Sequence, residues 1–138
     1  MCGINGIFQL SSSGTHLKDA VSAMNAQLAH RGPDDNGIWI DDTHGLALGQ
    51  TRLSILDLSS AGHQPMHDSE AKNTIVFNGE IFNFQLLNNK FLNDETFNSH
   101  SDTETLLKLY RKFGLDMLQH LNGMFAFALW DASKEELI

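Results

Sequence analysis

Apolar positions along this chain recur with two periods, which predict both strands and helices. Residues 3–10 alternate loosely between apolar and polar types and predict an N-terminal strand. Residues 16–31 carry an apolar stripe with spacings of four, three and four, which is typical of an amphipathic helix. The stripe consists of Leu17, Val21, Met24 and Leu28. The helix should end before Pro33, because proline cannot continue a helix.

The remainder of the chain is rich in apolar runs of the β type. We expect strands over residues 36–42, 45–58 and 74–83, and a hairpin over residues 122–138. We expect helices over residues 82–91, 101–114 and 115–121, with loops over residues 59–73 and 93–100. The second of these helices has the clearest limits, since Ser101 or Asp102 can cap its start and Gly114 can end it. Strands joined as hairpins, with helices packed outside them, predict an α+β fold of antiparallel sheets.

Length and composition fit a single globular domain of 138 residues with a net charge of −8. That charge argues against nucleic acid as a partner, because phosphate binding needs clustered Lys and Arg and only nine such residues occur here. No apolar run approaches the roughly 20 residues that a membrane-spanning helix needs, and no signal-peptide pattern opens the sequence. The single cysteine excludes an internal disulfide, which fits a cytoplasmic protein.

That single cysteine is the second residue, Cys2. If Met1 is removed, which so small a second residue permits, Cys2 carries both a thiol nucleophile and a free α-amine. An α-amine titrates at about pH 7.7–8.0 and suits general-base work near neutrality. The alternative is a buried free cysteine, which is common in protein cores. Position and composition alone leave both interpretations open.

Three further features each have a chemical and a structural interpretation. Arg52 lies in an apolar strand, where it could bind a substrate carboxylate or form a salt bridge to an acidic residue. Asn78 and Gly79 could form an oxyanion hole from a side-chain amide and a backbone N–H, or simply an Asn-Gly turn. Asp102 could receive a substrate ammonium or cap a helix.

Two histidine-containing segments complete the candidates. In the polar turn HRGPDD, a supporting network could form from His30, Arg31 and Asp34. A metal-binding module could use His63 and His67, although the proline between them excludes a helical pair of ligands.

Taken together and in order, these motifs are far more specific than each is alone. The succession MCGI, HRGPD, RLSI, NGEIFN, SDTE and GMFAFALWD resembles the class II glutamine amidotransferase domain, one of the N-terminal nucleophile hydrolases. The similarity is closest to the glutaminase domain of glutamine-hydrolysing asparagine synthetases and covers essentially the whole chain. It implies a four-layer αββα sandwich of two antiparallel sheets.

The resemblance implies a catalytic role for three residues. Cys2, with its α-amine free, would attack the side-chain amide of L-glutamine and form a glutamyl thioester, which water converts to glutamate. Asn78 and the N–H of Gly79 would hold the oxyanion. The ammonia released would serve a downstream ATP-dependent synthetase, most simply one that makes asparagine from aspartate.

The resemblance also implies how the substrate is bound. Arg52 would bind the α-carboxylate of glutamine, Glu80 and Asp102 would receive its α-ammonium, and backbone groups of residues 53–56 would line the pocket. The substrate-binding residues would thus be Arg52, Leu53, Ser54, Ile55, Leu56, Asn78, Gly79, Glu80 and Asp102. No metal or cofactor is expected for this half-reaction. One departure is Phe82, where relatives often have tyrosine, so one hydroxyl is missing at the edge of the site.

The resemblance further implies that residues 1–138 form a glutaminase domain that is incomplete at its C-terminus. A synthetase domain of the same full-length chain, with ATP and Mg²⁺, would be the partner. Loss of the continuation should expose a strand edge near residues 125–130 and favour homodimer formation or aggregation. Two alternatives stay open: ammonia delivery to another acceptor, as in sugar or polysaccharide amidation, and a non-catalytic regulatory domain of the same fold.

Overall fold

The computed structural model describes residues 2–9, 16–55, 57–70 and 72–138. Its strands are β1 (Gly3–Phe8), β2 (Asp35–Asp41), β3 (Leu46–Arg52), β4 (Met66–His67), β5 (Asn73–Ile81), β6 (Gly123–Asp131) and β7 (Glu136–Leu137). Its α-helices are α1 (Leu17–Leu28), α2 (Phe84–Phe91) and α3 (Asp102–Phe113). Short 3-10 helices cover Ala29–Arg31, Ser60–Gly62 and Gly114–His120. The predicted strand residue Leu10 and the predicted pocket residue Leu56 lie outside the described residues.

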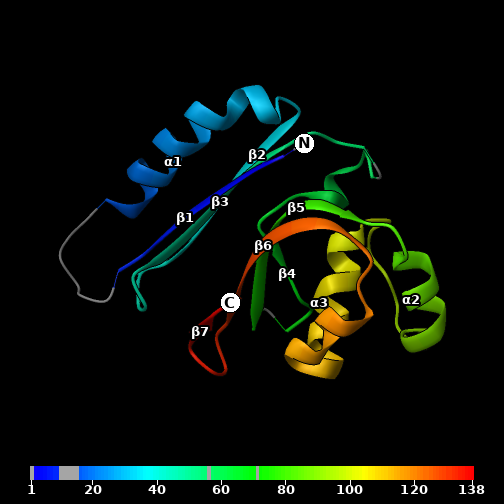
Figure 1. Cartoon of the computed structure of the whole chain (residues 1–138). Coiled ribbons are helices and arrows are strands. Elements are labelled where there is room, and N and C mark those ends of the chain that lie inside the picture. The colour runs from blue at the N-terminus through cyan, green and yellow to red at the C-terminus, as the bar shows by residue number, and fades with distance from the viewer. Residues whose placement is uncertain (1, 10–15, 56, 71) are drawn as a thin grey trace.

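The strands form two antiparallel sheets, with the orders β1-β3-β2 and β4-β5-β6-β7. Helix α1 lies along the outer face of the first sheet, while α2 and α3 lie on the outer side of the second (Figure 1). The order of layers is therefore helix, sheet, sheet, helix, which confirms the predicted α+β sandwich. Among the described residues, no helix has the length and apolar character needed to cross a bilayer.

Helix α1 packs on the first sheet largely as its apolar stripe predicts. Leu17 and Val21 are buried against Ala47 of β3. Met24, however, is 39% exposed, and its neighbour Asn25 is buried in its place. Asn25 is accommodated because its side-chain amide donates to Asn36 Oδ1 at 2.8 Å, so its polar atoms remain hydrogen-bonded.

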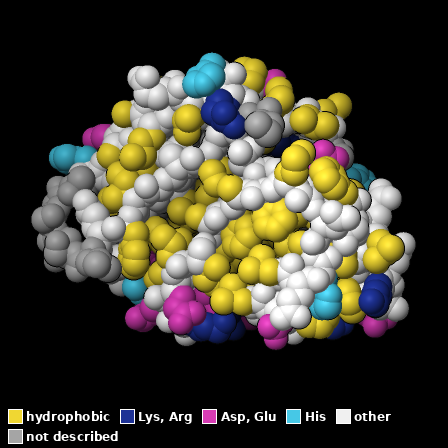
Figure 2. All heavy atoms as spheres, viewed as in Figure 1, with side chains coloured by type: hydrophobic (Ala, Val, Ile, Leu, Met, Phe, Trp, Pro, Cys, Tyr) yellow, Lys and Arg dark blue, Asp and Glu magenta, His cyan; other side chains and the backbone are white. Residues whose placement is uncertain are grey.

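The two sheets face each other through a second apolar cluster. Leu46 and Leu48 of β3 pack against Val76 of β5 and Trp130 of β6. On the face drawn in Figure 2, hydrophobic side chains gather in the hollow between the sheets. The alternation along β3 that turns Leu46 and Leu48 inward also turns Arg52 inward, at the end of the sheet where Cys2 lies.

Helices α2 and α3 cover the outer face of the second sheet with the largest apolar cluster. Leu106 and Leu109 of α3 are fully buried there with Ile75 and Ile81 of β5. Ser101 caps α3, since its hydroxyl accepts from Thr103 N at 3.1 Å, and Gly114 ends it with φ of 58°.

Two predictions about local structure are wrong. The strand expected over residues 45–58 ends at Arg52, because the backbone N–H of Leu53 donates to Cys2 Sγ instead of continuing the ladder. The loop expected over 59–73 contains the two-residue strand β4. The strand expected over residues 74–83 is confirmed as β5. It excludes the alternative of an Asn-Gly turn, because Asn78 and Gly79 lie inside β5 and pair with Ala126 and Phe125 of β6.

The outer edge of β6 is only partly covered. Strand β7 pairs with β6 at Trp130 and Asp131, and Ile138 adds hydrogen bonds to Leu129. Within the described residues, the stretch of β6 before Leu129 has no partner on that side. The expected association of two copies through this edge stays a prediction.

Candidate active site

The N-terminus of β1, the end of β3, the middle of β5 and the start of α3 meet around a cavity of about 190 Å³. Eight of the predicted site residues line it: Cys2, Arg52, Leu53, Ile55, Asn78, Gly79, Glu80 and Asp102. Ser54 does not line it. A larger cavity of about 390 Å³, between α2 and the loop that precedes α3, contains none of the predicted residues.

Cys2 directly precedes β1 and is half-buried at this cavity. Its Sγ accepts from Leu53 N at 3.4 Å and lies 3.7 Å from Leu53 O. Its backbone carbonyl accepts from Arg31 Nε at 3.0 Å. The first described residue of the chain is therefore held from two sides, by β3 and by the HRGPDD turn.

The HRGPDD turn supports the site through two of its three predicted residues. Besides the contact between Arg31 and Cys2, Asp34 Oδ2 accepts from Ser54 N at 2.8 Å. His30 bonds only to the nearby carbonyl of Gln27, at 3.0 Å. The turn runs so close to β3 that a Cβ on the intervening Gly32 would overlap the backbone of that strand. Glycine at this position thus lets the turn reach both sides of the cavity.

Gly79 lines the cavity, and the direction of its backbone N–H follows from its neighbours in β5. The neighbouring odd-numbered residues turn their N–H groups away from β6, since Phe77 N donates to Gln64 Oε1 at 2.6 Å. Ile81 N likewise donates to Asp102 Oδ2, at 2.9 Å. Alternate N–H groups of a strand point to the same side, so that of Gly79 points to this edge as well. Among the described residues no acceptor bonds to it, which leaves a backbone donor free for a ligand.

The side chain of Asn78 lies on the face of β5 that is turned toward the first sheet, as that of Val76 does. Its Oδ1 is buried without a hydrogen-bond partner among the described residues. That oxygen is an acceptor and is available to a donor of a ligand or a water molecule, whereas an oxyanion would be met by the NH₂ group of the same side chain. One strand thus presents a side-chain amide and a free N–H to the same cavity, from adjacent residues.

Arg52 is 7% exposed and is held by backbone carbonyls. Its Nη1 donates to Ser59 O at 3.0 Å, and its Nη2 donates to the carbonyl of Asp57. Among the described residues no carboxylate lies within ion-pair distance of it, so the alternative of a salt bridge to an acidic residue is wrong. Carbonyls orient a guanidinium but leave its positive charge available to an anionic ligand.

Asp102 is 4% exposed and follows the residue that caps α3. Its carboxylate accepts from Ile81 N, whereas the N–H of Thr103 donates its capping bond to the hydroxyl of Ser101, so Ser101 and not Asp102 is the N-cap. Burial raises the pKa of Asp102, and the negative charge of Glu80 raises it further. A cationic ligand between these two carboxyl groups would relieve both effects.

Comparison with known proteins decides the family. Residues 1–138 match the profile of the glutamine amidotransferase domain. The chain belongs to this family. It is 44% identical to the putative asparagine synthetase [glutamine-hydrolyzing] 2 of Methanocaldococcus jannaschii, over 97% of the chain and 28% of that protein.

Two further relatives carry different names. The chain is 38% identical to asparagine synthetase B [glutamine-hydrolyzing] of Escherichia coli, over 98% of the chain and 24% of that protein. It is 35% identical to amidase chry2 of Gibberella zeae, over 100% of the chain and 22% of that protein. This amidotransferase domain therefore spans about a quarter of the length of the curated relatives that it matches.

The histidines considered as metal ligands have other partners in this amidotransferase domain. His63 Nδ1 lies 2.7 Å from Asp35 Oδ2, and His67 Nδ1 lies 2.9 Å from Thr74 Oγ1. Burial lowers the pKa of His67, which favours its neutral form. Among the described residues no three His, Cys, Asp or Glu side chains are grouped to hold a metal ion.

Sequence inspection missed two buried residues beside the cavity. Gln64 lines it, donates from Nε2 to Thr103 Oγ1 at 3.1 Å and accepts from Phe77 N. Asp57 lies behind Arg52, and its carboxylate is bonded to Ser59 of its own turn and to His100 of the loop before α3. No local pattern indicates either role, because the decisive partners are 39 and 43 residues away along the chain.

Proposed function

We propose that this domain hydrolyses the side-chain amide of L-glutamine to glutamate and ammonia through a thioester on Cys2. One observation carries the proposal: the only thiol of the chain, at position 2, lines the same cavity as the free N–H of Gly79. A nucleophile and an oxyanion donor at one cavity are the minimum for acyl transfer.

The reaction then follows from the groups present. With Met1 removed, the α-amine of Cys2 takes the thiol proton, and the sulfur attacks the amide carbon of glutamine. The carbonyl oxygen becomes an oxyanion, stabilised by the N–H of Gly79 and the amide of Asn78. The α-ammonium returns the proton to the leaving nitrogen, so ammonia departs and the thioester remains. The amine next takes a proton from water, whose oxygen attacks the thioester, and the thiolate leaves as glutamate forms.

The two ends of glutamine match the charges around the cavity. In this proposal the α-carboxylate lies against Arg52, whose guanidinium is bonded to carbonyls and, among the described residues, has no carboxylate within ion-pair distance. The α-ammonium lies at Asp102 and Glu80, where it would offset the burial and the repulsion from Glu80 that raise the pKa of Asp102. Leu53 and Ile55 line the side next to Cys2, and Phe82 supplies no hydroxyl.

Replacement of Arg52 tests the carboxylate contact. We expect Arg52→Ala to raise the glutamine concentration for half-maximal rate about tenfold to a hundredfold, because a charge-assisted bond contributes roughly 1.5–3 kcal/mol. Arg52→Lys should restore little of this, since lysine cannot reach two carbonyls and a carboxylate at once. Steady-state kinetics on the folded fraction provide the measurement. Unchanged half-saturation in both variants would exclude Arg52 from substrate binding.

Replacement of Asp102 separates binding from stability. Because the pKa of Asp102 is raised on folding, its stabilising contribution is present below its unfolded pKa and is lost as pH rises through the folded pKa. At neutral pH, Asp102→Asn should therefore raise or preserve the melting temperature while it weakens glutamine binding. In the wild type, glutamine affinity should fall as pH drops through the raised pKa. Melting curves and half-saturation against pH test both parts, and a variant that loses stability but binds normally would contradict them.

For the whole protein, we propose that the ammonia passes to a synthetase domain that makes asparagine with ATP and Mg²⁺. The names and lengths of the bacterial and archaeal relatives support this. So do Ile55 and Met124, which line the cavity yet are 67% and 71% exposed, an apolar rim that a partner domain could cover. In this proposal the chain acts as part of a ligase in the cytoplasm, where reducing conditions keep Cys2 free.

The fungal amidase names support the second candidate, delivery of ammonia to a different acceptor. Products formed from glutamine and each candidate acceptor by the full protein would decide between the two.

Covalent labelling tests the glutaminase proposal itself. A glutamine-shaped diazoketone should add its mass to Cys2 and to no other residue, and free glutamine should protect against it. Labelling of other residues alone, or none at all, would favour a non-catalytic domain of the same fold.

A further inference from the structure

The two charged groups that would bind the ends of glutamine sit on separate loops. Arg52 ends β3 and is held by the loop over residues 57–62, whereas Asp102 starts α3 behind the loop over residues 98–101. An α-amino acid contacts both groups only if the two loops keep a fixed separation. What holds that separation is therefore part of substrate recognition, given the proposed function.

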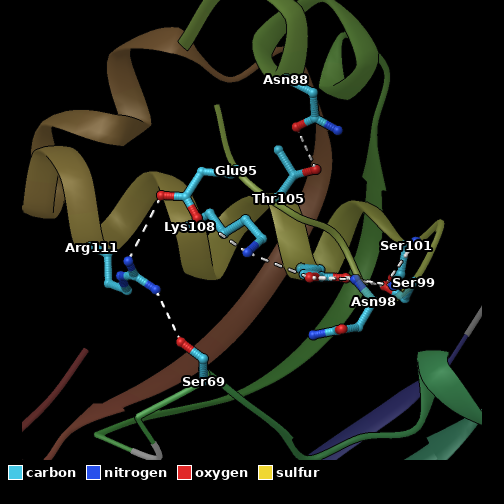
Figure 3. A network of polar contacts seen from close by, with 10 residues as sticks. Ser69, Asn88, Glu95, Asn98, Ser99, Ser101, Thr105, Lys108 and Arg111 are labelled. Carbon is cyan, nitrogen blue, oxygen red and sulfur yellow. Dashed lines mark hydrogen bonds and ion pairs between the residues drawn. The ribbon is translucent and has the colours of Figure 1, made fainter. Parts of the chain in front are cut away.

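The loop over residues 98–101 is tied firmly to α3. The carboxylate of Glu104 accepts from Asn98 N at 3.0 Å, and from Ser99 N and Ser99 Oγ at 2.7 Å each. Lys108 lies 3.6 Å from Glu104 and 3.4 Å from Glu95, and it thereby links the two carboxylates. Figure 3 shows Lys108 of α3 beside Glu95. This loop therefore forms one body with α3 and Asp102.

Asp57 joins the other loop to this body. Its Oδ2 accepts from His100 N at 2.8 Å, in the loop that precedes α3. Its Oδ1 accepts from Ser59 N at 2.8 Å and from Ser59 Oγ at 2.6 Å. The side chain is 6% exposed, and the bonds from Ser59 and His100 lower the pKa of Asp57 to about 2, so it is ionised at neutral pH.

The turn that Asp57 holds is the one that orients Arg52. The carbonyls of Asp57 and Ser59 both accept from the guanidinium, and Gly62 packs so closely that a Cβ there would overlap it. The path from one charged group to the other thus runs from Arg52 through the 57–59 turn and the Asp57 carboxylate to His100, two residues before Asp102.

We infer that Asp57 is a positioning residue that fixes the spacing between Arg52 and Asp102, and with it the preference of the site for amides that carry both an α-carboxylate and an α-ammonium. Asp57 lines no part of the cavity and touches no substrate in this arrangement. Its effect would be on selectivity rather than on the chemical step.

Asp57→Asn in the full protein tests the inference. Asparagine keeps the size and an acceptor for Ser59, but presents an NH₂ group to the N–H of His100, so the bond between the loops is lost. We expect half-saturating glutamine to rise about tenfold while kcat changes less than about threefold, because a uniform binding contact has been lost. The preference for glutamine over 4-carbamoylbutanoate, which lacks only the α-ammonium, should fall by a similar factor.

A matched control separates this effect from general loosening of the fold. Asp68 holds another turn, accepting from Lys72 N at 2.9 Å and Asn73 Nδ2 at 2.6 Å, and it does not line the cavity. Asp68→Asn should leave both half-saturation and the preference unchanged. Alkylation of Cys2 by iodoacetamide, which needs neither charged group, should proceed at the wild-type rate in both variants.

Each outcome is decisive. Unchanged half-saturation and preference in Asp57→Asn, with a wild type that hydrolyses glutamine, overturn the inference and leave the proposed function intact. An equal loss of activity toward glutamine and 4-carbamoylbutanoate, together with slower alkylation of Cys2, also overturns the inference, because general unfolding of the site would give the same result. If Asp57→Asn does not fold, Ser59→Ala provides the second variant: it removes the 2.6 Å bond to Asp57 together with the bond that Ser59 Oγ accepts from Ala61 N at 3.2 Å, and it should shift the preference in the same direction. A wild type without glutaminase activity refutes the proposed function instead.

Discussion

A protein that keeps Met1 should hydrolyse no glutamine, although it folds as well as the processed form. The proposed base is the α-amine of Cys2, and a peptide bond from Met1 converts that amine into an amide with no basic lone pair. Cys2→Ala should abolish turnover for a different reason, since it removes the only thiol of the chain. In both cases we expect activity to fall to the background of the assay, while the melting temperature stays close to that of the processed protein.

Two control proteins sharpen this prediction. An N-terminal extension that a protease removes to leave Cys2 first should restore activity fully on cleavage. Cys2→Ser keeps a hydroxyl and the α-amine, and should fold normally with greatly reduced turnover, because an alcohol is far less readily deprotonated than a thiol. Activity in a protein shown by mass to retain Met1 would contradict the role of the α-amine.

Asn78→Ala should lower kcat by about a hundredfold to a thousandfold with little change in half-saturating glutamine. A donor aimed at the oxyanion acts mainly in the transition state, and removal of one such donor costs about 2.7–4 kcal/mol. Asn78 pairs with Ala126 through its backbone, so the strand should persist after the side chain is lost. Its buried Oδ1 has no partner to leave unsatisfied among the described residues, and the melting temperature should fall little.

Asn89→Ala is the matched control for this variant, since Asn89 is an exposed asparagine of α2 away from the cavity. Its kinetics should equal those of the wild type. If Asn78→Ala instead raised half-saturating glutamine at constant kcat, the amide would bind the ground state and the oxyanion role would be wrong.

Much of the fold could be predicted because local signals and tertiary environment agree. The capping Ser101 and terminal Gly114 delimit α3 at both ends, and the apolar run before Asp131 forms β6. Where a prediction failed, a contact distant in sequence had decided the structure. Met24 of α1 is exposed because Asn25, bonded to residues of β1 and β2, takes the buried position. β3 ends at Arg52 because Cys2, 51 residues before Leu53, takes up the next N–H.

In the candidate site, too, some features could be predicted from the sequence and others depend on contacts distant in sequence. The order of motifs predicted which residues would meet, and the structure brings eight of the nine described ones to one cavity. The order of motifs did not predict which contacts hold each of these residues in place. An Asn-Gly pair ordinarily forms a turn, yet here β6 approaches the strand so closely that only glycine fits opposite Phe125. Likewise, the link from Asp57 to His100 spans 43 residues and leaves no trace in local sequence.

Glutamate release from glutamine by protein whose first residue is shown by mass spectrometry to be Cys2 tests the proposed glutaminase most directly. The assay should run in parallel on processed protein, on protein that retains Met1 and on Cys2→Ala, with ammonia measured beside glutamate. We expect equal amounts of both products from the processed protein alone, without added ATP or metal. Processed protein that is folded, labelled by iodoacetamide at Cys2 and still unable to release glutamate would contradict the proposal.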